Sequence, residues 1–573
     1  MTNTLSRKSK ISRGGMWTLV HLTAVIAFVT GGVLAEASDH EFIQNLMETM
    51  TLSDKIGQMA QIDINEMTED DPLEPGKKRL DMARVKTVIG ENGVGSVLNY
   101  IQGRPFTPKE MREATMLIQE VAKNFSRPPV IWGLDSVHGA NYVHGAILSP
   151  QPINIAATFN TSVSYAAGQL ASRDTRAVGI NWLFSPLMGL AIEPFWSRIY
   201  ETFGEDPLVV AAMGSNMIAG IQTDLQDGGI PSKAAACAKH FVGYSAPHNG
   251  HDRSPAWIPT RHLYQYFVPP WQAAIQEQVL TVMESYSETD GVPNVANPNT
   301  LRYLLRQRLG FQGVLVTDYQ EILNLKNWHH ISRNEQDAVV HSLREGSVDM
   351  SMIPHDEVSF HDSVSDGVAN GMLVEERINE SAERVLKLKS TLNMFHEELV
   401  LEDVNLDKIG QDEESGLDMA RQSIVLVKNN GALPLNASPA KKILVTGPSS
   451  NSLVYQSGGW TGEWQGVSVS EENRFFTYGE TVLAAMNATF GESVTYACGV
   501  DIMGDDCEDN LDDKDDSSIL DQVNEIYGEV KDWVGFGSGP PSNSMERAAA
   551  LASEVDTVVI CIGEESYTEK VNF

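Results

Sequence analysis

Short apolar runs, each followed by polar or ionisable residues, recur along the first two thirds of the chain. Runs of this length and composition predict short buried strands. Helical stretches separate them, at 108–123, 165–178 and 208–222. The repeated order of strand, polar end and helix predicts an α/β fold, a (β/α)8-like TIM barrel. The runs with their polar ends are Pro129-Val130-Ile131 before Asp135, Leu183-Phe184 before Ser185, Ala234 to Ala238 before Lys239 and His240, and Val314 to Val316 before Asp318.

Asp318 follows the last of these runs, in a Gly-Phe-x-Gly context that begins at Gly310. Its carboxylate contributes nothing to the packing of a strand. In a βα barrel the C-terminal ends of the strands carry the catalytic groups. An aspartate at a strand-to-helix turn is also an ordinary helix N-cap. This segment alone leaves both readings open, and the other polar groups at strand ends favour the catalytic one.

The pattern changes in the last third of the chain, where a second α/β unit is expected. A helix over 416–423 leads into the apolar run 424–428, and further buried strands are predicted at 442–445 and 555–562. We therefore expect a barrel over 38–395, a charged linker over 396–414 and an α/β sandwich domain over 415–573.

The composition excludes some classes of partner. A formal charge of −34 over 573 residues argues against nucleic acids and anionic membranes, which select basic patches. It says little about a neutral substrate. No Cys/His spacing is typical of a zinc site, and the pairs His329-His330 and His248/His251 are interpreted as loop residues. We expect no metal and no cofactor.

The N-terminus has the pattern of a secretory signal peptide over 1–37. A basic region precedes the apolar stretch 17–34, and Ala35-Glu36-Ala37 offers a small-x-small cleavage site. An uncleaved anchor is the alternative, because the stretch approaches the length of a spanning helix. We therefore expect a secreted or extracellular protein, a lysosome-like compartment also being open, with no stable membrane association after cleavage. Five glycosylation sequons fit this route, at Asn124, Asn160, Asn379, Asn436 and Asn487.

Four cysteines are present. Cys498 and Cys507 lie nine residues apart in a polar segment and are predicted to form a disulfide in an oxidising compartment. Cys237 and Cys561 lie in apolar runs and are predicted to remain buried thiols.

Four motifs follow one another along the chain: Asp135-Ser136-Val137-His138-Gly139, the stretch Trp196 to Pro207, Lys239-His240-Phe241 and the stretch Gly310 to Tyr319. Together and in this order they are specific, and the chain from about Thr51 onward resembles the glycoside hydrolase family 3 β-glucosidases, in the branch of plant exo-glucanases and lysosomal-type β-glucosidases. The segments 458–466 and 563–569 resemble the second-domain signatures of that branch. In the family, more sheet and helix follow the second of these segments, whereas this chain stops nine residues after Glu564. The resemblance therefore implies a C-terminally truncated second domain with an uncovered edge strand.

The resemblance implies hydrolysis of a glycosidic bond with retention. Such chemistry needs two carboxyl groups roughly 5–5.5 Å apart, one nucleophilic and one protonated. By the resemblance, Asp318 is the nucleophile and Glu564, from the second domain, is the general acid. The neighbouring Glu565 and Glu569 leave the choice of acid within that motif open.

The resemblance also assigns substrate contacts. Side chains that pair with adjacent hydroxyls orient a neutral sugar, and aromatic rings wall a second sugar. Alternatives remain: Asp135 as a helix cap, Arg198 paired with Glu201 or Glu205 across its turn, and Trp460 as either a wall or a core residue. The residues assigned to substrate binding are Asp135, Arg198, Lys239, His240, Tyr286, Tyr319 and Trp464.

The function implied is that of an exo-acting, retaining β-glucosidase that removes terminal β-glucosyl residues from β-glucans or β-glucosides. A β-N-acetylhexosaminidase of the same family is an alternative, although Val242 and Tyr244 stand where those enzymes carry Pro and His or Asp after Lys-His-Phe. A β-xylosidase and an inactive, truncated sugar-binding protein also remain open, as does the oligomeric state.

Overall fold

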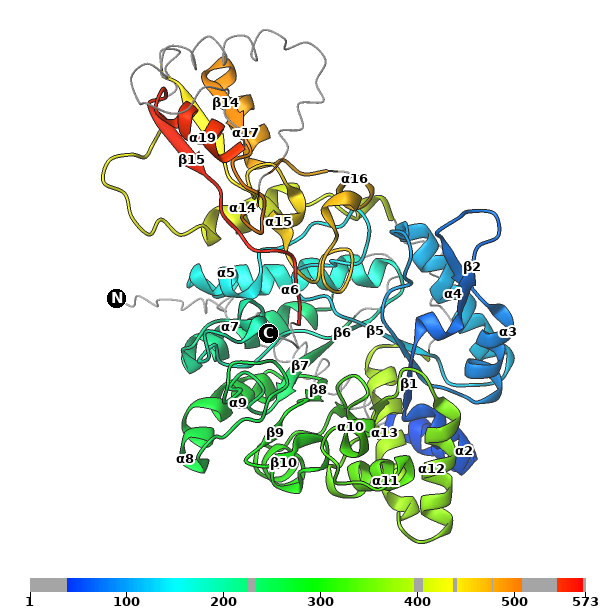
Figure 1. Cartoon of the computed structure of the whole chain (residues 1–573). Coiled ribbons are helices and arrows are strands. Elements are labelled where there is room, and N and C mark those ends of the chain that lie inside the picture. Colours follow the sequence, from blue (N-terminus) through cyan, green and yellow to red (C-terminus); the bar gives the residue numbers. More distant parts are fainter. Residues whose placement is uncertain are drawn as a thin grey trace, which may run out of the picture.

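The computed structural model describes residues 39–224, 233–395, 406–435, 441–476, 478–505, 507 and 544–569. It contains a barrel and a smaller α/β unit that lies beside one end of it (Figure 1). The predicted signal peptide lies outside the described residues. Within the described ranges, every helix is too short or too polar to cross a membrane.

Among the described residues, eight parallel strands build the barrel in the order β11-β8-β7-β6-β5-β4-β1-β12. A parallel bridge between Val316 and Met350 brings the two outer strands together. The sheet is therefore nearly closed, which confirms the predicted TIM-type fold. The strands are β1 Ala60–Asp63, β4 Ser96–Leu98, β5 Ile131–Leu134, β6 Trp182–Leu183, β7 Ala235–Phe241, β8 Thr281–Glu284, β11 Val314–Val316 and β12 Ser351–Met352.

Helices surround these strands (Figure 1), and local signals set where they begin. Thr107 and Glu110 form a capping box at the start of α4. The carboxylate of Asp206 accepts a hydrogen bond from the N–H of Leu208 at 2.7 Å. This aspartate, at the end of the motif 196–207, therefore caps the start of α7. The helices are α2 Leu52–Gln58, α3 Met82–Val85, α4 Pro108–Asn124, α5 Pro152–Ala157, α6 Thr161–Ala177, α7 Pro207–Ile221, α8 Thr260–His262, α9 Val268–Gln276, α10 Glu321–Asn327, α11 Glu335–Glu345, α12 Glu357–Ala369 and α13 Glu375–Thr391.

Shorter elements complete this unit. π-helical turns occur at Lys86–Glu91, Leu263–Phe267 and Pro298–Arg308, and 3₁₀ turns at Ile64–Met67, Ser197–Glu201 and Asn294–Ala296. Two small antiparallel hairpins lie outside the barrel sheet. They pair β2 Thr68–Asp70 with β3 Lys78–Leu80, and β9 Glu288–Thr289 with β10 Val292–Pro293.

Glycines allow α6 and α7 to approach closely. A Cβ added to Gly220 would lie 2.1 Å from the carbonyl oxygen of Tyr165, and one added to Gly168 would lie 2.5 Å from that of Met217. Real Cβ atoms do not come this near to backbone, so both positions require the absence of a side chain. The backbones of the two helices therefore pack directly against each other.

Apolar side chains fill the interior of the barrel. Trp182, Phe184 and Cys237 are buried there together with Met283 and Val316. The indole N–H of Trp182 donates to the hydroxyl of Thr281 at 2.8 Å, which satisfies the polar edge of its ring. This packing restricts polar groups to the open C-terminal ends of the strands.

The second unit is built on a parallel sheet in the order β14-β13-β15. α17 contacts β14, and α19 contacts both β13 and β14. A parallel sheet with helices packed on it is the predicted α/β type of second domain. Its elements are α14 Glu413–Ser423, β13 Ile443–Thr446, α15 Leu453–Ser457, the 3₁₀ turn Val469–Glu471, α16 Glu472–Phe475, α17 Val482–Phe490, the 3₁₀ turn Gly491–Ser493, β14 Val494–Ala497, α19 Ser544–Ala552 and β15 Thr557–Ile560.

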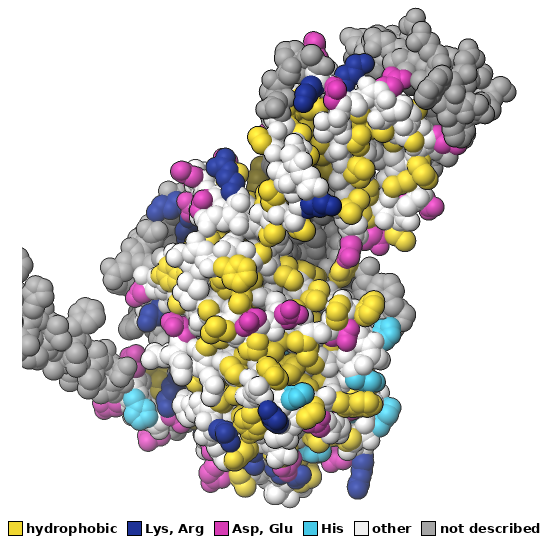
Figure 2. All heavy atoms as spheres, turned by 90° about the vertical axis from the view of Figure 1, so that its left-hand side faces the viewer, with side chains coloured by type: hydrophobic (Ala, Val, Ile, Leu, Met, Phe, Trp, Pro, Cys, Tyr) yellow, Lys and Arg dark blue, Asp and Glu magenta, His cyan; other side chains and the backbone are white. Residues whose placement is uncertain are grey.

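One predicted strand of this unit is wrong. The apolar run 424–428 is not part of a sheet, and its side chains are exposed, to 77% at Ile424 and 90% at Val427. An apolar run becomes a strand only when a neighbouring strand pairs with its backbone, and neither β14 nor β15 does so here. Figure 2 shows hydrophobic side chains gathered on the surface of this unit.

The cysteines and most of the sequons lie in described parts of the chain. Cys498 and Cys507 are joined in a disulfide, Cys237 is buried in the barrel, and Cys561 is partly exposed rather than buried. Asn124 and Asn487 are exposed on helices, Asn160 caps α6, and Asn379 is half-buried on α13. Asn436 lies outside the described residues, and glycosylation at these sites stays a prediction.

Candidate active site

Asp318 lies two residues beyond the end of β11 and is 7% exposed. Its backbone N–H donates to the carboxylate of Glu284 at 3.0 Å, and its Oδ2 lies 3.5 Å from Nε2 of His240. Helix α10 begins three residues later, at Glu321, without a side-chain cap. Asp318 is therefore not used as a helix cap, and its side chain faces the barrel mouth.

Lys239 and His240 reach this mouth from β7. Consecutive residues of a regular strand point to opposite faces, but the pairing of β7 with β8 shifts its register between Ala238 and Phe241. Such an irregularity redirects side chains beside a functional site. Lys239 then pairs with Asp135, which follows β5, at 2.6 Å, while His240 turns towards Asp318.

Arg198, on the 3₁₀ turn Ser197–Glu201, is buried below the mouth. Its Nε and Nη2 donate to Glu201 at 2.7 and 2.9 Å. Pairing across the turn, left open by the sequence, therefore occurs. The remaining Nη1 donates to Glu569 at 2.8 Å, so this guanidinium also reaches the site.

Arg253 and Asp252 are site residues that the sequence interpretation missed. Arg253 forms an ion pair with Glu569, and its guanidinium lies 4.1 Å from the centre of the Tyr286 ring. Asp252 accepts from the indole of Trp196 at 2.7 Å and from the hydroxyl of Tyr244 at 2.9 Å. Both residues follow the Lys-His-Phe strand in a polar loop, and nothing in the local pattern shows that Asp252 is buried or that Arg253 is half-buried.

Tyr286 and Tyr319 follow the neighbouring strands β8 and β11 and are in contact. The hydroxyl of Tyr286 donates to the backbone carbonyl of Tyr319 at 2.7 Å. The hydroxyl of Tyr319 lies 3.5 Å from Asp63, at the end of β1, and 3.3 Å from His355. Tyr319 is therefore directed towards the β1 side of the mouth.

The second unit adds the loop 458–466 to the site. Trp460 is buried, and its ring centre lies 5.1 Å from Nζ of Lys239 and 5.8 Å from the Arg198 guanidinium, distances at which cations interact with aromatic rings. Trp464, predicted to wall the site, is 43% exposed, and its backbone N–H donates to the hydroxyl of Tyr100 at 3.1 Å. Trp460 is thus the aromatic residue of this loop that contacts the predicted binding residues.

The two carboxylates at either end of the motif 563–569 occupy different surroundings. Glu564 is exposed and accepts a hydrogen bond from the hydroxyl of Tyr567 at 2.6 Å. Glu569 lies in the mouth between Arg198 and Arg253, its side chain 6% exposed. The structure therefore brings Glu569, and not Glu564, next to the barrel residues of the site.

Burial dominates the electrostatics. It raises the pKa of Asp318 to about 8, with a further increase from the Glu569 carboxylate, while Arg198 and Lys239 act in the opposite direction. Burial holds the pKa of His240 well below its ordinary value, and the nearby Arg198 lowers it further. Both effects favour the neutral imidazole, whose Nε2 lies 3.5 Å from Oδ2 of Asp318 without a hydrogen bond between the two atoms.

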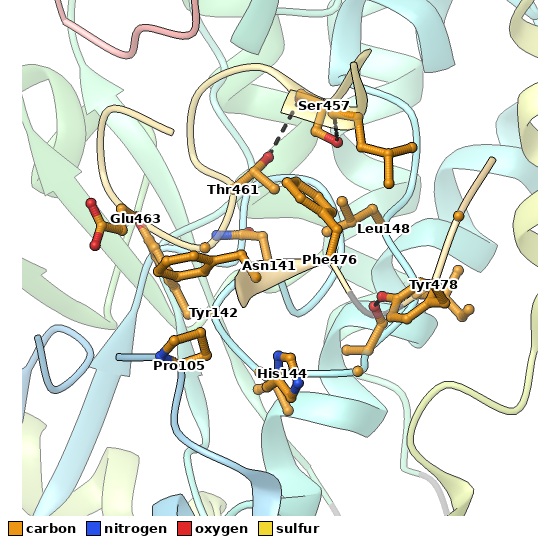
Figure 3. Close-up of a pocket in the computed structure, with 18 of the residues that line it drawn as sticks. Pro105, Asn141, Tyr142, His144, Leu148, Ser457, Thr461, Glu463, Phe476 and Tyr478 are labelled. Atoms are coloured by element: carbon orange, nitrogen blue, oxygen red, sulfur yellow. Dashed lines mark hydrogen bonds between the residues drawn. The ribbon is translucent and has the colours of Figure 1, made fainter. Parts of the chain in front are cut away.

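A cavity of about 670 Å³ lies beside this site, between barrel loops and the second unit. Figure 3 shows Phe476 and Tyr478 of the second unit across from Tyr142 and Leu148 of the barrel. The rings of Tyr142 and Tyr100, both in the lining, are stacked with centres 4.4 Å apart. Within the described residues, no cluster of three or more His, Cys, Asp or Glu side chains is arranged to hold a metal.

A parallel βα barrel with buried carboxylates and cations at its C-terminal mouth, partly covered by a second α/β unit, is an arrangement typical of enzymes that act on small polar substrates. The chain belongs to glycosyl hydrolase family 3. Residues 51–388 match the N-terminal domain of that family, and residues 424–572 match its C-terminal domain.

Relatives and solved structures agree with this membership. The chain is 36% identical over 540 residues to the lysosomal beta glucosidase of Dictyostelium discoideum, a match covering 91% of this chain and 61% of that protein. It is 26% identical to the periplasmic beta-glucosidase of Salmonella typhimurium, covering 92% and 63%. The chain thus spans less than two thirds of the length of either relative.

Two solved structures are similar in fold. The beta-glucosidase of Listeria innocua in complex with isofagomine matches with a TM-score of 0.71 and 25% identity, covering 92% of this chain and 64% of that one. The exo-1,3/1,4-beta-glucanase of a Pseudoalteromonas species matches with a TM-score of 0.73 and 23% identity, covering 93% and 59%.

Proposed function

We propose that the protein is an exo-acting, retaining β-glucosidase that hydrolyses terminal β-D-glucosyl residues of β-glucans and β-glucosides. The observation that carries the proposal is the position of Asp318 at the end of β11, facing His240 and close to the Lys239–Asp135 pair. Family membership and the names of the two beta-glucosidase relatives support the same activity.

In the first step, Oδ2 of Asp318 attacks the anomeric carbon and the bond to the leaving oxygen breaks. Glu564 gives its proton to that oxygen, so the aglycone leaves as a neutral alcohol. Asp318 must be ionised for this attack. Arg198 and Lys239 favour the ionised form, whereas burial and Glu569 oppose it.

In the second step, water attacks the anomeric carbon of the glucosyl ester. The Glu564 carboxylate takes a proton from that water, and the bond to Asp318 breaks, which releases glucose and restores both carboxyl groups. Asp135, Lys239 and Arg198 supply charged acceptors and donors for the sugar hydroxyls. Burial raises the pKa of Asp135, and the adjacent Lys239 opposes that increase.

The cellular location belongs to the same proposal. The basic and apolar N-terminal pattern and the lysosomal and periplasmic relatives support entry into the secretory route. We place the working protein outside the cytosol, as a secreted or lysosome-like hydrolase. A disulfide between Cys498 and Cys507 is consistent with such a compartment.

The test is turnover of a chromogenic β-glucoside by the purified chain and by Asp318→Ala. We expect activity in the wild type and a loss of several decades in kcat for the variant, because the covalent route is gone. The matched control is Asp366→Ala, which changes an exposed aspartate on α12.

A variant at Asp318 that kept more than about a tenth of the wild-type rate would contradict its role as nucleophile. Parallel assays with a β-xyloside and an N-acetyl-β-glucosaminide test the substrate. A preference of the wild type for either one would replace the glucosidase assignment while leaving the family membership in place.

A further inference from the structure

The carboxylate of Glu569 bridges two arginines that come from different barrel loops. Its Oε1 accepts from Nη1 of Arg198 at 2.8 Å, and its Oε2 is bound to Nη2 of Arg253. Burial alone would raise the pKa of Glu569, but the two guanidinium groups outweigh it and leave that pKa below its ordinary value. This anion therefore ties the motif 563–569 to the barrel through two ion pairs.

The residues just before Glu569 are also attached. The N–H of Thr568 donates to Oε1 of Gln465 at 2.8 Å, and the Thr568 hydroxyl donates to the carbonyl of Trp464. The backbone carbonyl of Tyr567 accepts from the hydroxyl of Tyr200, a barrel residue, at 3.0 Å. The end of the motif is thus hydrogen-bonded both to the barrel and to the loop 458–466.

The start of the motif is held differently. Glu564 is exposed, and its carboxylate accepts the 2.6 Å hydrogen bond from the Tyr567 hydroxyl. Glu569 is five positions after Glu564, a separation that can span roughly 17 Å when the chain is extended. The position of Glu564 relative to the barrel mouth is therefore restrained mainly by its hydrogen bond to Tyr567 and by the attached residues 567–569.

We propose that Glu569 is a positioning residue of the reaction: its bridge to Arg198 and Arg253 fastens the motif to the barrel so that Tyr567 can hold Glu564 for proton transfer. The proposal rests on the proposed function, in which Glu564 is the acid. It assigns Glu569 no contact with the reacting atoms. Without the bridge, the motif keeps the hydrogen bond between Tyr200 and Tyr567 but loses both of its ionic contacts with the barrel loops, and Glu564 loses its defined approach.

The test compares Glu569→Gln with the wild type on an alkyl β-glucoside and on 2,4-dinitrophenyl β-glucoside. Departure of an alkoxide needs a proton from Glu564, whereas dinitrophenolate leaves without one. We expect kcat/KM for the alkyl glucoside to fall about 100-fold, near the lower end of the usual contribution of a general acid. The dinitrophenyl value should change less than about threefold, and azide should raise its kcat by replacing the activated water.

Three further variants separate positioning from other roles. Glu569→Asp keeps the charge and should recover part of the loss. The double variant Glu564→Ala/Glu569→Gln should be no slower on the alkyl glucoside than Glu564→Ala alone, because Glu569 acts through Glu564. Glu492→Gln, at an exposed glutamate of the second unit, should behave as the wild type.

Two kinetic results would overturn the proposal. An equal fall of kcat/KM for both glucosides would mean that Glu569 supports the site as a whole. A fall in KM with faster turnover of both would mean that Glu569 competes with the sugar for Arg198.

A measurement that does not depend on enzymatic activity tests the attachment of the motif by Glu569 independently of the proposed function. Hydrogen–deuterium exchange of a peptide covering 563–569 should be faster in Glu569→Gln than in the wild type, because losing the two ion pairs should loosen the whole segment, including the hydrogen bond from the Thr568 N–H to Gln465. Unchanged exchange would refute the anchor. If the wild type turned over no glycoside at all, the proposed function would fail while this measurement still decided whether Glu569 fastens the motif.

Discussion

Replacing Asp318 by asparagine should stabilise the fold while abolishing catalysis. Asp318 is 7% exposed, and burial with the nearby Glu569 carboxylate raises its pKa to about 8, against 3.8 for an ordinary aspartate. A group with a raised pKa binds its proton more tightly in the folded state. As pH rises above 3.8 the unfolded chain ionises first, so the folded state loses stability until the pH reaches about 8.

The magnitude follows from the width of that window. Each pH unit inside it costs the folded protein roughly 1.4 kcal/mol. At pH 7 the window spans about 3 units, which gives a penalty of roughly 4 kcal/mol. Asparagine has nearly the same shape and cannot ionise, so it removes this penalty. The difference in stability between Asp318→Asn and the wild type should therefore grow with pH and level off above about 8.

The assay is thermal unfolding of both proteins from pH 5 to pH 9. For a protein of this size a few kcal/mol corresponds to several degrees in Tm, so the variant should melt several degrees higher at pH 7, and the difference should be less than half as large at pH 5, where the window spans only about 1 unit. Asp366→Asn, on an exposed face of α12, is the control and should show no such trend. A difference that stayed constant across the pH range, or a variant less stable at pH 8, would refute the reasoning.

Two other substitutions test the framework of the barrel by thermal unfolding. Lys389 is buried; its Nζ donates to the side chain of Gln58 and to the carbonyl of Gly95, and burial lowers its pKa to about 7. The unfolded chain therefore takes up this proton first as pH falls from 10 to 7, and the folded wild type loses stability over that range. Lys389→Met should remove this pH dependence. A slope that persisted in Lys389→Met would show that another group causes it. Gly220→Ala should lower Tm by several degrees, because its Cβ would meet the carbonyl of Tyr165 at 2.1 Å. Asn216→Ala, on the same helix, should cost much less, and equal losses would contradict direct contact between the α6 and α7 backbones.

Much of the barrel could be predicted because its signals are local. The run Val314 to Val316 is a buried strand with the bounds that the pattern indicates, and the helix predicted over 108–123 spans Pro108–Asn124 after its capping box. Caps and periodicity act over a few neighbouring residues, so they can be read without knowing the fold. The run 424–428 failed for the opposite reason, because a strand also needs a partner that local pattern does not supply.

The sequence alone places Asp135, Lys239, His240 and Asp318 at or just beyond the C-terminal ends of strands of one barrel, which is enough to gather them at its mouth. Which carboxylate of the motif 563–569 lies among them became visible only in the folded protein. Glu569 reaches Arg198 and Arg253 across 371 and 316 residues of chain. Contacts between residues so distant in sequence depend on how the two units pack, and so does the burial that raises the pKa of Asp318. Such packing cannot be predicted from the local pattern of apolar and polar residues.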